Sequence, residues 1–196
     1  MQIISVINQK GGVGKTTTVI NLAAGLSQLN KKILVIDLDP QGNATTGLGL
    51  SKMNKSSDTI YEVLNGTKEI DEVIKKTGLD NLDIITSNVD LSGLEVETAD
   101  DSNRAFILKS KLSSYLNNSR GSYDYVLIDC PPALGLLTLN AFVASDGVLV
   151  PLQCEYLALE GLSQLVRTVE RVRDTFNRSL SIQGIVLTMY DGRNNL

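Results

Sequence analysis

Short apolar runs alternate with segments of helical periodicity along this chain, and that alternation limits the fold more than any other feature. Apolar residues recur at spacings of three and four from Val19 to Leu29, and residues 157–176 repeat the pattern. This alternation predicts an α/β fold in three layers, a mostly parallel sheet with helices on both faces. The predicted strands are rich in isoleucine, valine and leucine and lie at residues 3–7, 32–37, 82–86, 123–129, 147–152 and 182–189.

Length and hydropathy favour a single cytoplasmic domain. The chain has 196 residues, close to the usual size of one compact domain, so we expect one domain over residues 1–196. No run approaches the ~20 apolar residues of a membrane helix. The first residues, MQIISVI, lack the charged segment that opens a signal peptide. We therefore expect a cytoplasmic protein without membrane contact.

Charge and the absence of histidine narrow the possible chemistry. The net charge is -4, so any DNA binding would need a local basic patch. The chain contains no histidine, which excludes imidazole bases and Ser-His-Asp triads. Cys130 and Cys154 lack C-x-x-C spacing and are expected to be reduced, buried thiols. Catalysis must therefore use carboxylates, lysines, backbone dipoles or a bound cation.

The segment QKGGVGKTT, residues 9–17, joins the first predicted strand to the first predicted helix. There the glycine amides and the helix N-terminus would face an anion, and phosphate is the natural ligand. A glycine-rich turn that only connects the two elements is the weaker alternative. Gln9 replaces the first glycine of the strict G-x-x-x-x-G-K-[ST] pattern, so the loop is a variant. Its expected nucleotide-binding residues are Lys10, Gly11, Gly12, Val13, Gly14, Lys15, Thr16 and Thr17.

Carboxylates end two predicted strands: Asp37 and Asp39 close one, and Asp129 closes another. Ligands of parallel α/β sheets bind beyond the carboxyl ends of the strands, so these side chains can converge on the glycine loop. A buried carboxylate needs a nearby cation, and Mg²⁺ is the expected one, with Thr16 as a further ligand. A helix cap or a turn remains the alternative for any single aspartate.

Lys10 precedes the glycines and has no evident task, because Lys15 already serves the phosphates. On the outer side of the loop, Lys10 would face a neighbouring molecule. A cation supplied in trans stabilises phosphoryl transfer as an arginine finger does. An ordinary solvated lysine is the alternative.

The segments KGGVGKTT, DLDPQGNATTGLG, DCPP and PLQCEYLALEGL closely resemble the ParA/Soj family of chromosome and plasmid partition ATPases. That family lies within the deviant Walker A class, which also holds MinD and the nitrogenase iron protein. The resemblance covers nearly the whole chain and implies a P-loop NTPase fold that uses ATP and Mg²⁺.

The same resemblance implies a role for each site residue. Lys10 would act as the signature lysine across an ATP-dependent homodimer, and Lys15 would bind phosphate. Asp39 would orient the attacking water. Asp129 would be the Walker B carboxylate, and Asp37 would support the magnesium shell.

Slow ATP hydrolysis is expected, because without histidine a weakly basic carboxylate must position the water. The resemblance implies that a ParB/Spo0J-like partner stimulates turnover and that non-specific DNA retains the dimer on the nucleoid. A MinD-like positioning ATPase is one alternative, although the ending YDGRNNL has no amphipathic helix. A nucleotide-dependent binding module with little turnover is another.

The basic residues do not decide from the sequence whether the chain binds DNA. Arg193 resembles a DNA-contacting arginine of the family. Arg167 and Arg171 are one helical turn apart, but Glu170 and Asp174 interleave with them, so a salt-paired, solvated helix is favoured over DNA contact from these two residues. Family members usually continue further, so we also expect the chain to lack the family's C-terminal strand and helix.

Overall fold

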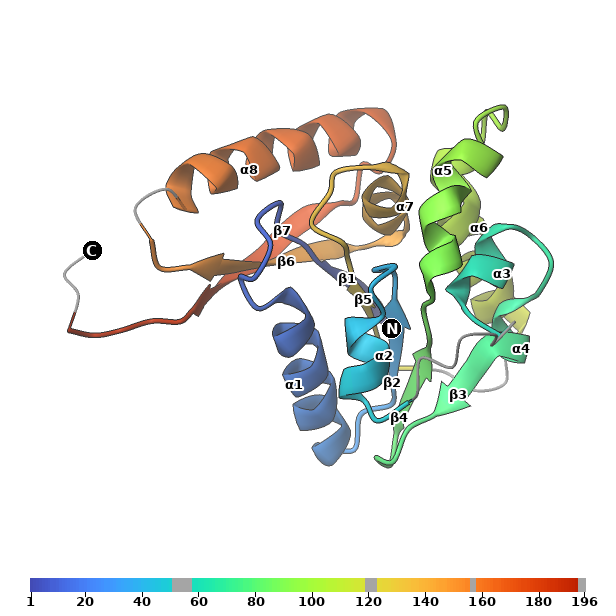
Figure 1. The fold of residues 1–196 in the computed structure, drawn as a ribbon, viewed down its shortest axis with the longest axis horizontal. Helices are drawn as coiled ribbons and strands as arrows, with labels where there is room; N and C mark the ends of the chain where they lie inside the picture. Colours follow the sequence, from blue (N-terminus) through green and yellow to red (C-terminus); the bar gives the residue numbers. More distant parts are fainter. Residues whose placement is uncertain (51–57, 119–122, 156–157, 194–196) are drawn as a thin grey trace.

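One seven-stranded sheet forms the centre of the computed structural model, which describes residues 1–50, 58–118, 123–155 and 158–193 (Figure 1). The strand order is β3-β4-β2-β5-β1-β6-β7, and every neighbouring pair is parallel except β3 and β4. The strands are β1 (Gln2–Val6), β2 (Ile33–Asp37), β3 (Ile74–Lys76), β4 (Leu82–Ile85), β5 (Tyr125–Asp129), β6 (Gly147–Gln153) and β7 (Ser181–Thr188).

Helices cover both faces of this sheet, as the alternation predicts. On one face lie α1 (Lys15–Gln28) and α2 (Asn43–Gly47), which pack on one apolar cluster. The remaining helices pack on a second, larger cluster across the sheet. They are α3 (Ile60–Leu64), α4 (Ile70–Val73), α5 (Leu94–Glu97), α6 (Ile107–Asn118), α7 (Leu136–Ala144) and α8 (Ala158–Thr175), with 3-10 turns η1 (Val89–Gly93) and η2 (Arg104–Phe106).

The central strands are apolar throughout because successive side chains enter opposite layers. In β2, Ile33 and Val35 join the cluster under α1, whereas Leu34 and Ile36 join the cluster under α7. All five residues of β2 are buried. This two-sided burial confirms the predicted three-layer fold.

The six predicted strands are all present, and β3 is an addition. Its sequence IKK has no apolar run, and it pairs antiparallel with β4 at the edge of the sheet. The acidic segment of residues 90–101 covers most of η1, all of α5 and the turn that follows, and its carboxylates are exposed. Cys130 is buried as expected, but Cys154 is half-buried, because it follows the last residue of β6 rather than lying inside the sheet.

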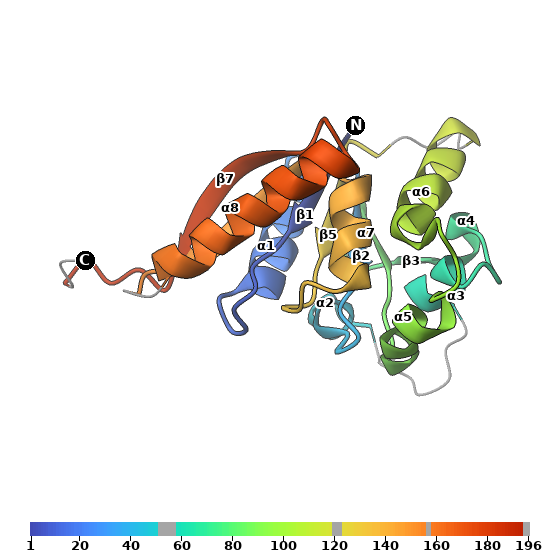
Figure 2. The same ribbon diagram turned by 90° about the horizontal axis from the view of Figure 1, so that it is seen from above.

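Strand β7 is the other edge of the sheet and projects beyond the body of the molecule (Figure 1). One of its faces lies against α8 (Figure 2), and Ile185 and Leu187 are exposed. In the described part of the chain no helix is long and apolar enough to cross a membrane.

Candidate functional site

The glycine loop leaves β1 at the carboxyl edge of the sheet and enters α1. Gly12 and Gly14 have φ angles of 76° and 87°, in the left-handed region that favours glycine. No described residue accepts a hydrogen bond from the backbone amides of residues 11–17. These amides and the start of α1 therefore form a concentration of free donors suited to an anion.

Lys15 begins α1 and folds back along the loop. Its Nζ donates to the Lys10 carbonyl at 3.1 Å, and the residue is buried. Burial lowers the pKa of Lys15, and the charges of Asp129 and Asp39 oppose that shift. The ammonium therefore lies close to both carboxylates, as the sequence predicts.

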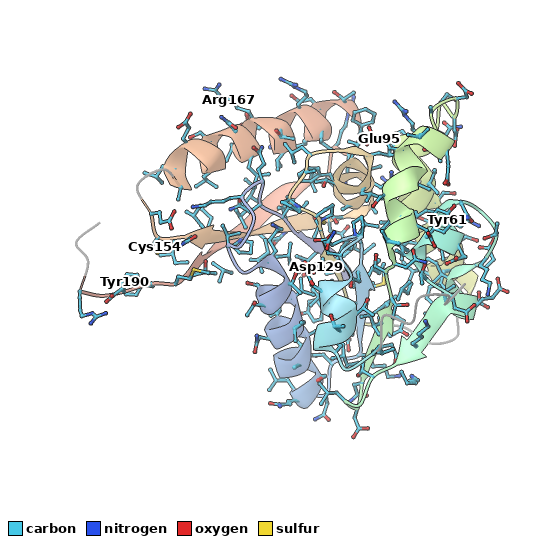
Figure 3. All side chains as sticks on the ribbon, viewed as in Figure 1. Tyr61, Glu95, Asp129, Cys154, Arg167 and Tyr190 are labelled. Atoms are coloured by element: carbon cyan, nitrogen blue, oxygen red, sulfur yellow. The ribbon has the colours of Figure 1, made fainter. Side chains whose placement is uncertain are left out.

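Thr16 and Asp129 meet directly. The Thr16 hydroxyl donates to Asp129 Oδ2 at 2.7 Å at the end of β5, beside the start of α1 (Figure 3). The other oxygen, Oδ1, is buried and has no hydrogen-bond partner among the described residues. Burial raises the pKa of Asp129 to about 7, with the neighbouring Asp37 and Asp39 adding to the shift. Such a carboxylate is poised to accept a cation.

Asp37, at the end of β2, is fully buried and holds the following segment in place. Its Oδ2 accepts hydrogen bonds from both the amide and the hydroxyl of Thr45, each at 2.7 Å, and its Oδ1 accepts the Asp39 amide at 3.3 Å. Burial raises the pKa of Asp37 to about 6, although the Thr45 hydrogen bonds oppose the shift. The structure thus gives Asp37 a task in anchoring α2, which sequence reasoning did not anticipate.

Asp39 lies in the turn after β2 and is 8% exposed. Its Oδ1 accepts the Gln41 amide at 2.9 Å, and its carbonyl accepts the Gly42 amide at 2.8 Å. These bonds fix the turn while the carboxylate remains in electrostatic contact with Lys15 and Asp129. The three predicted carboxylates therefore converge at one edge of the sheet.

Lys10 forms an ion pair with Glu155, which follows β6. The sequence gives Lys10 no acidic neighbour nearby, and the partner lies 145 residues further along the chain. Both side chains remain about half exposed, at 49% and 44%. In this single chain Lys10 is therefore partly solvated and paired with an acidic side chain that follows the neighbouring strand.

Asn8 is a functional candidate that sequence reasoning missed. Its amide donates to the Pro151 carbonyl of β6 at 2.7 Å, and its Oδ1 accepts the Lys10 amide at 2.9 Å. The side chain is buried and links the start of the loop to the sheet. Its position directly before the glycine loop could have marked it as a candidate in the sequence, but its contact with Pro151 follows only from the pairing of β1 with β6.

The arginines considered for DNA contact are exposed on the surface. Arg193 is 90% exposed and forms a two-point pair with Asp191, at 2.9 Å and 2.7 Å. Arg167 points outward from α8 (Figure 3). Among the described residues, neither Arg167 nor Arg171 has an ion pair, and Asp174 pairs with Arg173 instead. The salt-paired alternative therefore does not apply to these two arginines.

No group of three histidine, cysteine, aspartate or glutamate residues within the described ranges could enclose a metal ion. A cation at Asp129 would have to complete its shell with the Thr16 hydroxyl, water and ligand oxygens, as Mg²⁺ characteristically does.

Comparison with known proteins decides the family. The AAA_31 family model, described as an AAA domain, matches residues 1–182. The chain is 50% identical to the chromosome partitioning protein ParA of Caulobacter vibrioides, over all of this chain and 72% of that protein. The chain belongs to the ParA/Soj family. It is also 49% identical to the sporulation initiation inhibitor protein Soj of Bacillus subtilis, over all of this chain and 75% of Soj.

A solved structure supports the same fold for this ParA/Soj family member. It is cobyrinic acid a,c-diamide synthase from Mycobacterium smegmatis with a bound ATP analogue and magnesium. The two match with a TM-score of 0.91 and 39% identity over 99% of this chain and 75% of that one. The partition proteins are the more similar in sequence, so the family places this chain in a ParA-type role.

Proposed function

We propose that this chain is an ATPase of the ParA type that binds Mg-ATP, dimerises on it and hydrolyses it slowly. The observation that carries the proposal is the meeting of free loop amides, Lys15 and the Thr16–Asp129 pair at one edge of the sheet. The solved structure with a bound ATP analogue and magnesium, at 39% identity, supports the same ligand here.

The phosphates would lie against the loop amides, with Lys15 giving up the Lys10 carbonyl to reach them. The residues proposed to bind the nucleotide are Lys10, Gly11, Gly12, Val13, Gly14, Lys15, Thr16 and Thr17.

The residues present fit Mg²⁺. Asp129 offers a buried oxygen without a described partner, and Thr16 offers a hydroxyl beside it, both of them the hard donors that this ion prefers. Asp37 would support the magnesium site indirectly, by fixing α2 and the turn that carries Asp39. When bound, the ion neutralises charge on the phosphate oxygens.

Asp39 would accept a hydrogen bond from the attacking water and orient it. The turn fixes its position through the Gln41 and Gly42 amides. A carboxylate is a weak base, so this chain positions the water more than it activates it, and turnover should be slow. With hydrolysis as the slow step, the ATP-bound form is the one that accumulates.

Lys10 would act in the dimer, where it would leave Glu155 and approach the partner's nucleotide. A cation supplied in trans accelerates phosphoryl transfer by ~10³ to 10⁵. We further propose that the dimer binds non-specific DNA through Arg193, Arg167 and Arg171 and so associates with the nucleoid in the cytoplasm. A ParB/Spo0J-like protein would stimulate its ATP hydrolysis and so end the ATP-bound state. Dimerisation doubles the basic surface, so DNA binding would depend on ATP.

Phosphate release tests this proposal. We expect slow release from Mg-ATP by the parent protein, faster release with DNA and a ParB-like protein, and no nucleotide binding by Lys15→Ala. Lys31→Ala, at an exposed lysine beyond α1, is the matched control and should behave like the parent. Nucleotide binding without any phosphate release would favour the binding module instead. Retained affinity in Lys15→Ala would place the pocket elsewhere.

A further inference from the structure

Thr188, the last residue of β7, reaches the glycine loop from the far end of the chain. Its hydroxyl donates to the Val13 carbonyl at 2.8 Å, although 175 residues separate the two. Its own carbonyl accepts the Cys154 amide at 3.3 Å, so both its side chain and its backbone are bonded. A Cβ added to Gly14 would lie 3.5 Å from the Thr188 methyl group, which shows how closely the threonine approaches the loop.

This hydrogen bond fixes the orientation of one peptide group. In a planar trans peptide the carbonyl and the following N–H point in opposite directions. Because Thr188 binds the Val13 carbonyl, the Gly14 N–H must point away from β7. No described residue accepts a hydrogen bond from that amide, so it is free to donate to an anion.

Gly14 needs an external support of this kind. Its φ of 87° lies in a region where glycine moves freely, so the loop itself gives the Val13–Gly14 peptide little resistance to rotation. The Gly14 carbonyl is already fixed by the amide and hydroxyl of Thr18 in α1, at 2.9 Å and 2.8 Å. Thr188 supplies the corresponding restraint on the peptide before it.

The start and the end of the loop are thus fixed from adjacent strands. Asn8 bonds the first residues of the loop to Pro151 of β6, and Thr188 bonds its last turn to β7. These two strands pair in parallel, with Pro151 opposite Val186 and Gln153 opposite Thr188. The separation of the two anchors is therefore set by the sheet.

We propose that Thr188 is a positioning residue for the triphosphate site, and that its hydroxyl aims the Gly14 amide at the phosphate chain. The inference rests on the proposed Mg-ATP binding and adds a residue that the loop motif does not contain. Thr188 acts through Val13 and Gly14 and needs no contact with the nucleotide.

Substitutions that separate the hydroxyl from the methyl group test this role. Thr188→Val keeps the shape and removes the donor, whereas Thr188→Ser keeps the donor. We expect Thr188→Val to weaken the binding of a fluorescent ATP analogue with Mg²⁺ by about three- to tenfold, the effect of one hydrogen bond. Thr188→Ser should stay within about twofold of the parent. Thr168→Val, which removes a hydroxyl bonded within α8, should not change affinity.

Two results would overturn the inference: parental affinity in Thr188→Val, or equal weakening in the valine and serine variants, which would indicate methyl packing. Urea unfolding shows whether each variant is folded under the titration conditions. If Thr188→Val does not fold, Thr188→Cys replaces it, since a thiol is a much weaker donor of similar size. A parent protein that fails to bind the analogue would refute the proposed function rather than this inference.

Discussion

Lys10 and Glu155 form an ion pair that competes with the proposed dimer, because the Glu155 carboxylate holds the ammonium beside β6 and neutralises the charge that a partner's nucleotide would attract. The pair is half exposed, so it contributes modestly, on the order of 0.2 to 1 kcal/mol. Even that amount shifts a dimerisation equilibrium measurably. Glu155 would then set how much ATP is needed before the two subunits associate.

Replacing Glu155 with glutamine should therefore promote the dimer. We predict that Glu155→Gln lowers the ATP concentration for half-maximal dimerisation by about two- to fivefold, as measured by light scattering. Glu170→Gln, at an exposed residue of α8, is the control and should leave it unchanged. A higher ATP requirement in Glu155→Gln would mean that Glu155 supports the dimer rather than opposing it.

The raised pKa of Asp129 predicts how the stability of the fold changes with pH. Its pKa in the folded protein is about 7, above the value of an unfolded aspartate, so the folded state binds the proton more tightly. Without ligand, Asp129 therefore costs little stability near pH 4 and progressively more as pH rises to 7. We predict that Asp129→Asn raises the free energy of unfolding at pH 8 by roughly 2 to 4 kcal/mol.

The same substitution should remove most of the stabilisation that Mg-ATP gives, as thermal unfolding would show. Its stability advantage should disappear at pH 4, where the parental carboxyl is protonated. Asp80→Asn, at an exposed residue, should change neither quantity. An advantage that persists unchanged at pH 4 would mean that charge burial is not the cause.

One threonine bonds helix α2 to the buried Asp37, so this helix offers the sharpest test at the scale of the elements. Thr45 donates its amide and hydroxyl to Asp37, and its hydroxyl accepts the Ser87 amide at 3.1 Å. We predict that Thr45→Val destabilises the fold by about 1 to 3 kcal/mol in urea unfolding, because a buried carboxylate and a buried amide each lose a partner. Thr45→Ser keeps both bonds and should lose less than half as much.

The elements show what the sequence could and could not predict. Long apolar patterns predict the buried parallel strands and α1. The convergence of the strand-end carboxylates follows from the rule that ligands of a parallel sheet bind at the carboxyl ends of its strands. Strand β3 has no such pattern because it has only three residues, IKK, and two of them are lysines. Helix α2 has five residues, too few for helical periodicity to be visible.

The contacts across the site were beyond sequence reasoning for a different reason. Glu155 and Thr188 reach the loop only because β6 and β7 lie next to β1 in the sheet, and strand order is not visible in local patterns. Asp37 was predicted near the metal from its position, but its partner Thr45 depends on how α2 turns back on the sheet.

At the scale of the whole molecule, the proposal is that two copies share each nucleotide. In the proposed site Lys15, Thr16 and Asp129 act within one chain, whereas Lys10 is proposed to act on the nucleotide of a second chain. Loss of Lys10 should therefore affect assembly and leave the pocket intact, and loss of Asp39 should stop hydrolysis and leave assembly intact.

Light-scattering mass measurement with Mg-ATP tests this claim most directly. We predict that the parent protein forms a dimer that decays as ATP is consumed, that Asp39→Ala accumulates the dimer, and that Lys10→Ala binds ATP but stays monomeric. A Lys10→Ala protein that dimerises with ATP as the parent does would contradict the proposal that Lys10 acts on the nucleotide of the partner subunit.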